Sequence, residues 1–266
     1  GRTTGKITSQ HGLFYNYLLQ SVGKEQAMQY LYANEQAIQN IAKIVEEEKI
    51  NCDFEWQDNY VFAKDKESMK KIEKEQEALE YLGFKNSEIV KNIDIEIEAQ
   101  GAIKFKKQAQ FNAYLYAIGL ANKIIEKNGE IYEDSKVIDI KKDDNKYEII
   151  TEEGKIRAPI LVIATHYPII NAPGFYFLKM YQQTSYLIAI ETNAKLFDGM
   201  YINAEDDVIS LRTAKDGGKR IVLIGGSSHK TGAKIDLKNS YKNLEEKAKE
   251  LFPGCKILNE WNAEAC

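Results

Sequence analysis

Residues 160–165 (Ile-Leu-Val-Ile-Ala-Thr) constrain the fold of this chain more than any other segment. They form a continuous apolar run, which Pro159 precedes and the polar pair His166-Tyr167 follows. Side chains that are apolar on both faces of a strand are typical of a parallel strand covered by helices on both sides. The run therefore predicts a layered α/β domain. Because ligands of open α/β sheets bind at the carboxyl ends of the strands, it also predicts a site near Thr165.

The spacing of apolar residues predicts four helices. Residues three and four apart share one helix face, so a stripe at this spacing marks the side that packs on a core. In residues 23–48 such a stripe includes Ala27 and Leu31. Residues 108–127 are apolar around most of the circumference, which predicts a largely buried helix that ends at Asn128-Gly129. The four predicted helices span residues 23–48, 66–82, 108–127 and 240–251.

Short β-type segments fall into two groups. The first group lies before residue 160 and is expected at residues 60–63, 101–105, 137–140, 147–151 and 155–158. The second group is expected at residues 186–190, 200–202, 208–213 and 219–224. Since no helix separates the members of the second group, they predict an antiparallel sheet in a second lobe. The Lys-Asp-Gly-Gly sequence at 215–218 predicts a hairpin between the last two strands.

Charge and composition exclude several classes of protein. The net charge is −4, from 36 basic and 40 acidic residues, whereas a general nucleic-acid binder needs a basic excess. No run of 18 apolar residues predicts a membrane span. The three cysteines lack regular spacing, which favours a reducing, cytoplasmic location, and the three scattered histidines predict no metal site. We therefore expect a cytoplasmic protein that binds neither nucleic acid nor membrane.

One glycine-rich segment, residues 221–232, has the appearance of a phosphate-binding loop. It contains a short apolar strand followed by Gly-Gly-Ser-Ser-His-Lys-Thr-Gly. Its spacing matches neither Gly-x-Gly-x-x-Gly nor Gly-x-x-x-x-Gly-Lys-Ser/Thr, and no apolar helix follows directly. We interpret residues 225–232 as a polar loop at a sheet edge.

The first twelve residues have the composition of a ligand-binding loop. They contain three Gly, three Thr, one Ser, one His and two cations. Backbone N–H groups, hydroxyls and positive charge together suit an anionic ligand. The alternative is an N-terminal segment without a fixed structure.

Two segments carry a resemblance to a known family: TTGKITSQHG at residues 3–12, and the stretch from GAIKF at 101–105 to ATHYP at 164–168. With the order of elements around them, they resemble the FAD-dependent oxidoreductases of the D-amino-acid oxidase, glycine oxidase and sarcosine oxidase family. The segments KITSQHG and HKTG favour the branch in which this module is fused to a Rieske-type iron–sulfur domain. The resemblance implies an α/β (α+β) fold, with an incomplete FAD-binding Rossmann-like domain and a second lobe built on an antiparallel sheet.

The resemblance also implies a division into domains. Residues 1–55 and 97–172 would form parts of the FAD-binding domain, residues 56–96 and 173–254 the substrate-binding lobe, and residues 255–266 the start of a truncated return to the FAD domain. The family's glycine-rich turn is expected upstream of Gly1, and its last segment beyond Cys266. We therefore expect an internal fragment that holds FAD weakly and is inactive by itself.

Site residues follow from the same resemblance. The cofactor-binding residues it implies are Thr3, Thr4, Gly5, Lys6, Thr8, Ser9, Gln10, Val137, Ala164, Thr165 and His166. The first four correspond to the pyrophosphate and ribityl part of FAD, Val137 to the adenine end, and His166 stands where the family usually has Gly. His11 is the candidate catalytic residue near the flavin ring. His229 and Lys230 are candidates for binding a substrate carboxylate, the alternative being an exposed turn.

The implied function is oxidation of a C–N bond in an amine or amino acid by hydride transfer to the flavin. Because the flavin performs this chemistry, the absence of a nucleophile–base motif is consistent with it. Two alternatives are open. The chain could be a non-catalytic interaction or scaffold module that retains the fold, or a flavin dehydrogenase that passes electrons to an iron–sulfur partner.

Overall fold

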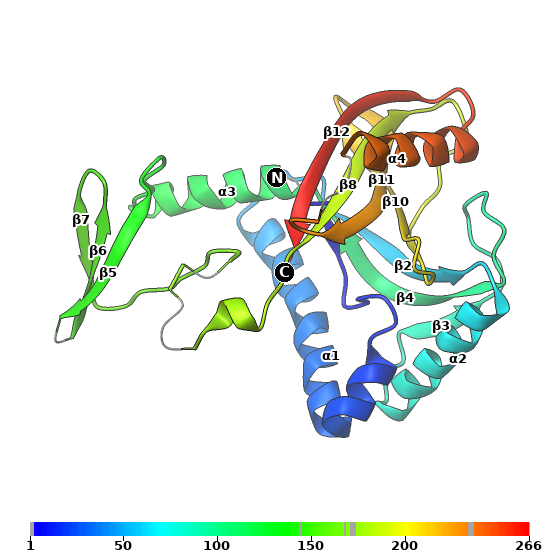
Figure 1. Cartoon of the computed structure of the whole chain (residues 1–266), viewed down its shortest axis with the longest axis horizontal. Coiled ribbons are helices and arrows are strands. Elements are labelled where there is room, and N and C mark those ends of the chain that lie inside the picture. The colour runs from blue at the N-terminus through cyan, green and yellow to red at the C-terminus, as the bar shows by residue number, and fades with distance from the viewer. Residues whose placement is uncertain (1–2, 144, 168, 171–173, 234–236, 266) are drawn as a thin grey trace. The chain divides into compact units, whose positions relative to one another are not determined.

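The computed structural model describes residues 3–143, 145–167, 169–170, 174–233 and 237–265 (Figure 1). Gly1, Arg2 and Cys266, which belong to segments discussed above, lie outside these ranges. The chain forms two compact units. Unit 1 comprises Gly1–Gly119 and Gln183–Ala265, and unit 2 comprises Leu120–Gln182. The domain boundaries implied by the family resemblance divide the chain differently, and they stay a prediction.

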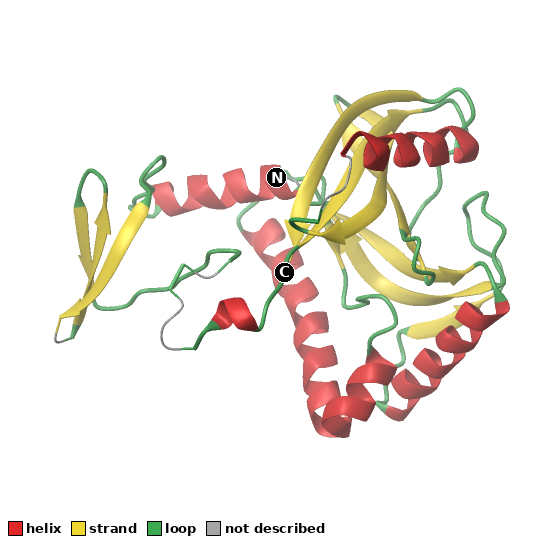
Figure 2. Cartoon of the chain, viewed as in Figure 1, coloured by secondary structure: helices red, strands yellow, loops and turns green. Residues whose placement is uncertain are grey.

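Unit 1 contains a curled sheet, which within the described residues has nine strands (Figure 2). Its strands are β1 (Lys6–Ile7), β2 (Glu55–Ala63), β3 (Ser87–Val90), β4 (Gly101–Gln110), β8 (Gln183–Glu191), β9 (Met200–Asn203), β10 (Ile209–Asp216), β11 (Lys219–Lys230) and β12 (Lys256–Ala265). The order is β1-β4-β2-β9-β10-β11-β8-β12, with β3 also on β4. Apart from the parallel pair β2–β9, the described neighbours are antiparallel. The predicted antiparallel sheet and the hairpin at residues 215–218 are confirmed.

Three of the four predicted helices form close to their expected bounds. They are α1 (Tyr15–Glu47), α2 (Lys66–Tyr81) and α4 (Leu237–Leu251). Helix α1 begins before the predicted range and is kinked at Gly23, whose φ of 81° is not helical. The Phe14 side chain does not cap this helix. Instead, the carboxylate of Glu75 in α2 accepts hydrogen bonds from the N–H groups of Tyr15 and Asn16, at 2.7 and 2.8 Å. Glu75 therefore fixes the start of α1.

Two clusters of side chains form the core of unit 1. On one part of the sheet, the inner residues of β8 and β11 pack against α4 and the segment after it. On the other part, α1 and α2 cover β2 and β4, with Leu31 and Leu79 against Ile103 and Phe105. The apolar stripes of α1 and α2 thus face the core, as predicted.

The third helix differs from its prediction. Residues 108–110 belong to β4, where they pair with β1 and β2, and α3 (Ala113–Glu126) begins after Asn112. The side-chain oxygen of Asn112 accepts hydrogen bonds from two N–H groups of the first turn, at 3.2 Å. No residue of α3 is buried in the described chain, so the prediction of a largely buried helix was wrong. An apolar circumference allows burial, but it does not supply a partner to pack against.

The predicted parallel strand at residues 160–165 was also wrong. These residues have no regular secondary structure, and the side chains of Ile160 and Val162 are 77% and 78% exposed. The strands expected near residues 137–158 do form in unit 2, where β5 (Val137–Asp143), β6 (Lys146–Thr151) and β7 (Lys155–Ala158) make an antiparallel meander. It also has a short 3-10 helix, η1 (Tyr176–Leu178). Within the described residues no strand pairs with residues 160–165. A strand needs pairing neighbours, which its own sequence does not provide.

The segment interpreted as a polar loop is mostly strand. Gly225 to Lys230 belong to β11 and pair with β8 across a bulge between Gly226 and His229. A Cβ atom on Gly226 would lie 2.5 Å from the carbonyl oxygen of Val208 and 3.2 Å from a methyl group of Leu244. The glycine therefore lets β11 pack closely against Val208 and helix α4. From the sequence alone, the same glycines look like those of a loop.

No described helix is long and apolar enough to cross a membrane. No group of three His, Cys, Asp or Glu residues in the described chain is arranged to hold a metal ion.

Candidate functional site

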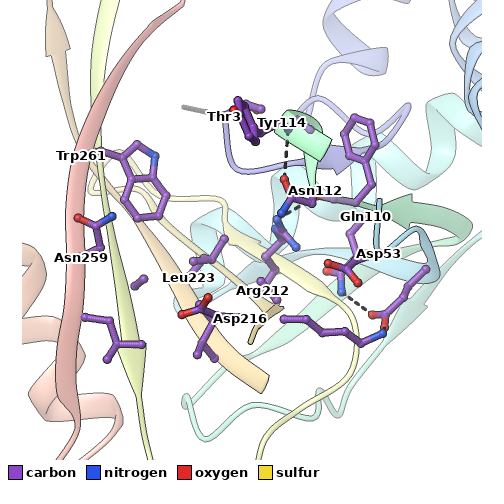
Figure 3. Close-up of a pocket in the computed structure, with 18 residues that line it drawn as sticks. Thr3, Asp53, Gln110, Asn112, Tyr114, Arg212, Asp216, Leu223, Asn259 and Trp261 are labelled. Carbon is purple, nitrogen blue, oxygen red and sulfur yellow. Dashed lines mark hydrogen bonds and ion pairs between the residues drawn. The ribbon is translucent and has the colours of Figure 1, made fainter. Parts of the chain in front are cut away.

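A cavity of about 450 Å³ in unit 1 is the candidate site (Figure 3). Its floor includes Ala189 of β8 and Leu223 of β11. The neighbours of these residues along each strand, such as Ile188 and Ile224, pack into the cluster that includes α4. Because side chains alternate between the two faces of a strand, the cavity lies on the face opposite α4.

The floor of the cavity follows the register of the sheet. Arg212 lies opposite Leu223, Leu223 opposite Ala189, and Ala189 opposite Asn259, so one row crosses β10, β11, β8 and β12. Ala189, Leu223 and Ile221 form a small apolar cluster, against which Ala214 and Trp261 pack. The small side chains of Ala189 and Ala214 leave space above the floor. Arg212, on β10, is the charged residue at the end of this row.

Polar side chains line the end of the cavity near β2 and β4. Glu55 forms an ion pair with Lys215 at 2.6 Å and accepts a hydrogen bond from Gln110 at 3.0 Å. Burial opposes the charged form of Glu55, but these two contacts outweigh it and lower its pKa. Gln110 is buried, and its side-chain oxygen has no hydrogen-bond partner. Thr3 and Asn112 complete this end.

Arg212 is the buried charge of the site. The residue is 6% exposed, and its guanidinium donates hydrogen bonds to the carbonyl oxygens of Thr4, of Phe111 at 3.3 Å and of Thr213 at 3.0 Å. Burial lowers its pKa to about 10, although Glu55 acts in the opposite direction. Within the described residues no carboxylate lies at ion-pair distance from Arg212. The guanidinium therefore holds the N-terminal loop by its backbone.

The loop around Gly5 is shaped by this contact. Gly5 has a φ of +68°, and a Cβ atom there would lie 2.3 Å from the carbonyl oxygen of Phe111 and 2.8 Å from Nη2 of Arg212. Only glycine fits this left-handed, closely packed position. The ammonium of Lys6 donates to the carbonyl oxygen of Tyr201 at 2.8 Å. Burial and the neighbouring charge of Arg212 lower the pKa of Lys6 to about 7.

The next predicted residues direct their side chains into the protein. The Thr8 hydroxyl accepts from the N–H of Gln10 at 3.0 Å. Ser9 donates from its hydroxyl to Glu35 at 2.5 Å, and its N–H donates to Gln108 at 2.7 Å. Gln10 bonds to Ile103 O and Asn59, and both Ser9 and Gln10 are buried. Their side chains anchor the loop, and the N–H groups of Ser9 and Gln10 are themselves engaged by Gln108 and Thr8.

His11, the predicted catalytic residue, lies outside the lining of the cavity. Its Nδ1 is 2.7 Å from the hydroxyl of Tyr30 in α1. Burial lowers its pKa, against a backbone hydrogen bond with Thr8 that raises it. A catalytic role for His11 stays a prediction.

The remaining predicted residues lie elsewhere. Val137 begins β5, and Ala164, Thr165 and His166 are exposed and irregular, all within unit 2. His229 is at the end of β11, where its Nε2 is 2.8 Å from the hydroxyl of Tyr186, a residue of the cluster that includes α4. Neither His229 nor Lys230 lines the cavity. Their assignment to substrate stays a prediction.

Sequence reasoning missed the cavity residues Arg212, Gln110, Glu55 and Trp261. Arg212 had a usable signal, because it is a lone charge in the apolar run Ile-Ser-Leu-Arg-Thr at residues 209–213. A charge at a buried strand position needs a partner or a ligand. The other three have no such signal, because only the pairing of strands far apart in the sequence brings these residues to one cavity.

Comparison with known proteins identifies the family. The profile of the family described as FAD dependent oxidoreductase matches residues 1–264. The chain belongs to this DAO family. A curated relative, "Putative Rieske 2Fe-2S iron-sulfur protein YhfW" of Bacillus subtilis strain 168, is 31% identical over 262 residues, which is 98% of this chain and 51% of that protein. The chain thus spans about half the length of the curated relative it matches.

Solved structures agree on the fold. Glycine oxidase from Geobacillus kaustophilus matches with a TM-score of 0.72 and 16% identity, over 100% of this chain and 74% of that one. Glycine oxidase from Bacillus cereus ATCC 14579 gives 0.69 and 20%, over 98% and 71%. L-proline dehydrogenase from P. horikoshii gives 0.69 and 16%, over 86% and 65%. The mixed α/β fold expected from the sequence is that of these DAO-family proteins.

FAD is the cofactor of this family. The residues of the N-terminal loop in unit 1 are compatible with it. The loop from Thr3 to Lys6 offers hydroxyl groups and a left-handed glycine, and the half-buried Lys6 and the buried Arg212 supply positive charge. These groups suit an anionic ligand that accepts hydrogen bonds, as the pyrophosphate of FAD does.

Proposed function

We propose that the protein is a flavoenzyme that oxidises the C–N bond of a small amine or amino acid. The observation that carries this proposal is the cavity beside the loop of Thr3 to Lys6, in a chain that belongs to the DAO family over residues 1–264. When bound, FAD supplies the acceptor for the hydride that leaves the carbon next to the substrate nitrogen. The names of the glycine oxidase neighbours support a substrate of this class.

Residues of the chain would bind and orient the two ligands. Thr3, Thr4, Gly5 and Lys6 are proposed to hold the pyrophosphate and ribityl part of FAD, with Thr8, Ser9 and Gln10 nearer the flavin ring. Val137, Ala164, Thr165 and His166 of unit 2 are proposed for the rest of the cofactor. The apolar floor at Ala189, Leu223 and Trp261 would keep water from the reacting carbon.

One observation favours a second candidate, a dehydrogenase that passes electrons to an iron–sulfur partner. The curated relative carries a Rieske 2Fe-2S name and is about twice the length of this chain. In this version the substrate chemistry and the cavity are the same, and only the electron acceptor differs. Little peroxide would then form in air.

The test is a spectroscopic one. The chain, extended by the segments expected before Gly1 and after Cys266, is incubated with FAD, freed of excess, and its visible absorption is recorded before and after anaerobic addition of glycine, sarcosine, L-proline or a simple amine. We expect retained flavin that loses its absorption with at least one of these compounds. Peroxide formed on admitting oxygen then distinguishes an oxidase from a dehydrogenase. Retained flavin that none of the compounds reduces would contradict the proposal, and so would protein that retains no flavin.

A further inference from the structure

The cavity has an apolar end, which strands β8, β10, β11 and β12 build together. The apolar lining residues are Ala189, Ala214, Ile221, Leu223, Leu258 and Trp261. Figure 3 shows Trp261 and Leu223 on one side of the cavity, and Gln110 and Asp53 on the other. None of the six side chains carries a charge, and the indole N–H of Trp261 is their one polar group. This end therefore offers a ligand mainly apolar contact.

Two alanines create the space at this end. Ala189 of β8 lies opposite Leu223 of β11, and Ala214 of β10 packs against the same small cluster. The positions before and after Ala189 hold Ile188 and Ile190, whose large side chains are fully buried on the other face of the sheet. Since side chains alternate between the two faces, a larger residue at either alanine would project into the cavity.

The cavity is larger than the smallest substrates need. Its volume of about 450 Å³ lies within the range of roughly 300–1,000 Å³ that is typical of sites for larger organic ligands. Glycine, whose side chain is a hydrogen atom, would leave the apolar floor in contact with water. A branched or ring-containing side group would cover this floor, and removal of apolar surface from water favours binding.

The charged end of the cavity does not favour one sign of charge strongly. Its lining has the carboxylates of Asp53, Glu55 and Asp216 and the cations Arg212 and Lys215. Glu55 is paired with Lys215, and Arg212 donates to backbone carbonyl oxygens. Within the described residues neither Asp53 nor Asp216 has an ion-pair partner. Such a mixed end can hold an ammonium group or the zwitterion of an amino acid, so selection among these ligands falls to the apolar end.

We propose that the cavity selects amines or amino acids whose side group is a ring or a branched chain. Ala189 and Ala214 determine this preference through the space that they leave. The inference rests on the proposed function in naming the ligand as an amine or amino acid. It separates this chain from a glycine-sized substrate, although two of the similar structures are glycine oxidases.

Trp261 allows binding to be measured without FAD. Trp56, the other of the two tryptophans, is 48% exposed and lies outside the lining of this cavity. In a Trp56→Phe background, selectively excited tryptophan fluorescence therefore reports on the apolar end alone. This parent protein is titrated with glycine, DL-alanine, DL-leucine and DL-phenylalanine, and in a second series with methylamine and benzylamine. Within each series the polar group is constant and only the side group changes. Calorimetry repeats the titrations without relying on fluorescence.

Two variants fill the space from different strands. Ala189→Leu does so from β8 and Ala214→Leu from β10, and Ala33→Leu, at an exposed position of α1, is the matched control. Because the added methyl groups enter existing space, each filled variant should melt within about 5 °C of the parent. Circular dichroism establishes that each variant is folded.

In the parent protein we expect affinity to rise by at least about tenfold from glycine to phenylalanine, and likewise from methylamine to benzylamine. Each filled variant should lose about tenfold or more in affinity for phenylalanine and benzylamine, with little change for glycine. Ala33→Leu should bind every compound as the parent does. If one filled variant does not fold, the other decides the question.

Several results would overturn the inference. They are equal affinity for small and large side groups in the parent, no binding of any compound, and folded filled variants that bind phenylalanine unchanged. Loss of folding in both filled variants would also overturn it, because the space would then not exist. Flavin that glycine reduces as well as the larger compounds do would support the flavoenzyme and contradict the size preference. Size-dependent binding in a protein that retains no flavin would do the reverse.

Discussion

Strands β10 and β11 have one closely packed face and one face that lines a cavity. On one face Leu211, Val222 and Ile224 are fully buried in the cluster that includes α4. On the other face, one residue along, Arg212 and Leu223 line a cavity and leave space and charge where the first face has close packing. The same strands thus have one face with the close apolar packing that favours stability and one face without it. Such departures are expected at functional sites.

The largest expected effect is on the packed face. Replacing Ile224, which is fully buried, by alanine should lower the free energy of unfolding by about 3 kcal/mol through lost burial and a new internal cavity. Replacing its neighbour Leu223 should cost distinctly less, because the cavity already exists there. Urea unfolding of both variants measures the difference. Equal losses of unfolding free energy in the two variants would mean that the two faces are packed alike, which would contradict the difference described above.

Gly5→Ala tests the loop that borders the cavity. The new methyl group would meet the carbonyl oxygen of Phe111 and the guanidinium of Arg212, at a φ that alanine disfavours. We expect a loss of about 2 kcal/mol of unfolding free energy, since backbone strain and a displaced contact both contribute. Gly217→Ala, at a hairpin position with positive φ and open space around it, is the control for strain alone. A loss no greater than that of the control would contradict close packing at Gly5.

Lys6→Met should change how stability depends on pH. The pKa of Lys6 is about 7 in the folded chain against an ordinary value of 10.5. Between these values the unfolded chain binds more protons, so the contribution of Lys6 to stability rises with pH from about 7 to about 10.5. Lys6→Met should remove this rise, seen as a melting temperature that changes by about 10 °C less across the window. Parallel pH profiles for variant and wild type would show that Lys6 is well solvated.

The smallest effect is expected at the rim of the cavity. Lys215 pairs with Glu55, but its side chain is 45% exposed. Lys215→Met should therefore cost at most about 1 kcal/mol, and less in high salt, because exposed ion pairs are weak and screened. Chemical denaturation at two salt concentrations measures this. A larger loss, independent of salt, would place the Glu55–Lys215 pair within the packed structure.

The packed face was predictable from sequence, and the cavity face was not. Alternation along β8 and β11, and the apolar stripes of α1 and α2, express contacts that repeat along a single element. The cavity depends instead on which strands lie side by side, as in the row from Arg212 to Asn259. Residues 160–165 show the same limit, because a continuous apolar run requires neighbours on both sides to become a strand.

Glycine-rich stretches were the second source of error. Residues 225–232 have the composition of a loop, yet Gly226 is a strand residue that allows the carbonyl of Val208 and a methyl of Leu244 to come close. The loop of Thr3 to Lys6 was identified as a ligand-binding element by its composition. Its anchor, Arg212, was not, because it lies about 200 positions further along the chain.

The parallel pairing of β2 with β9 has a consequence for synthesis of the protein. Strand β2 is made early, whereas β9 follows only after all of unit 2 has been translated. Until then one edge of β2 presents unpaired backbone groups, which can pair with other chains. At ordinary rates of translation, residues 64–199 take roughly 10–30 seconds to emerge. The ribosome-bound chain therefore passes through an interval in which half of its sheet is formed and open to aggregation.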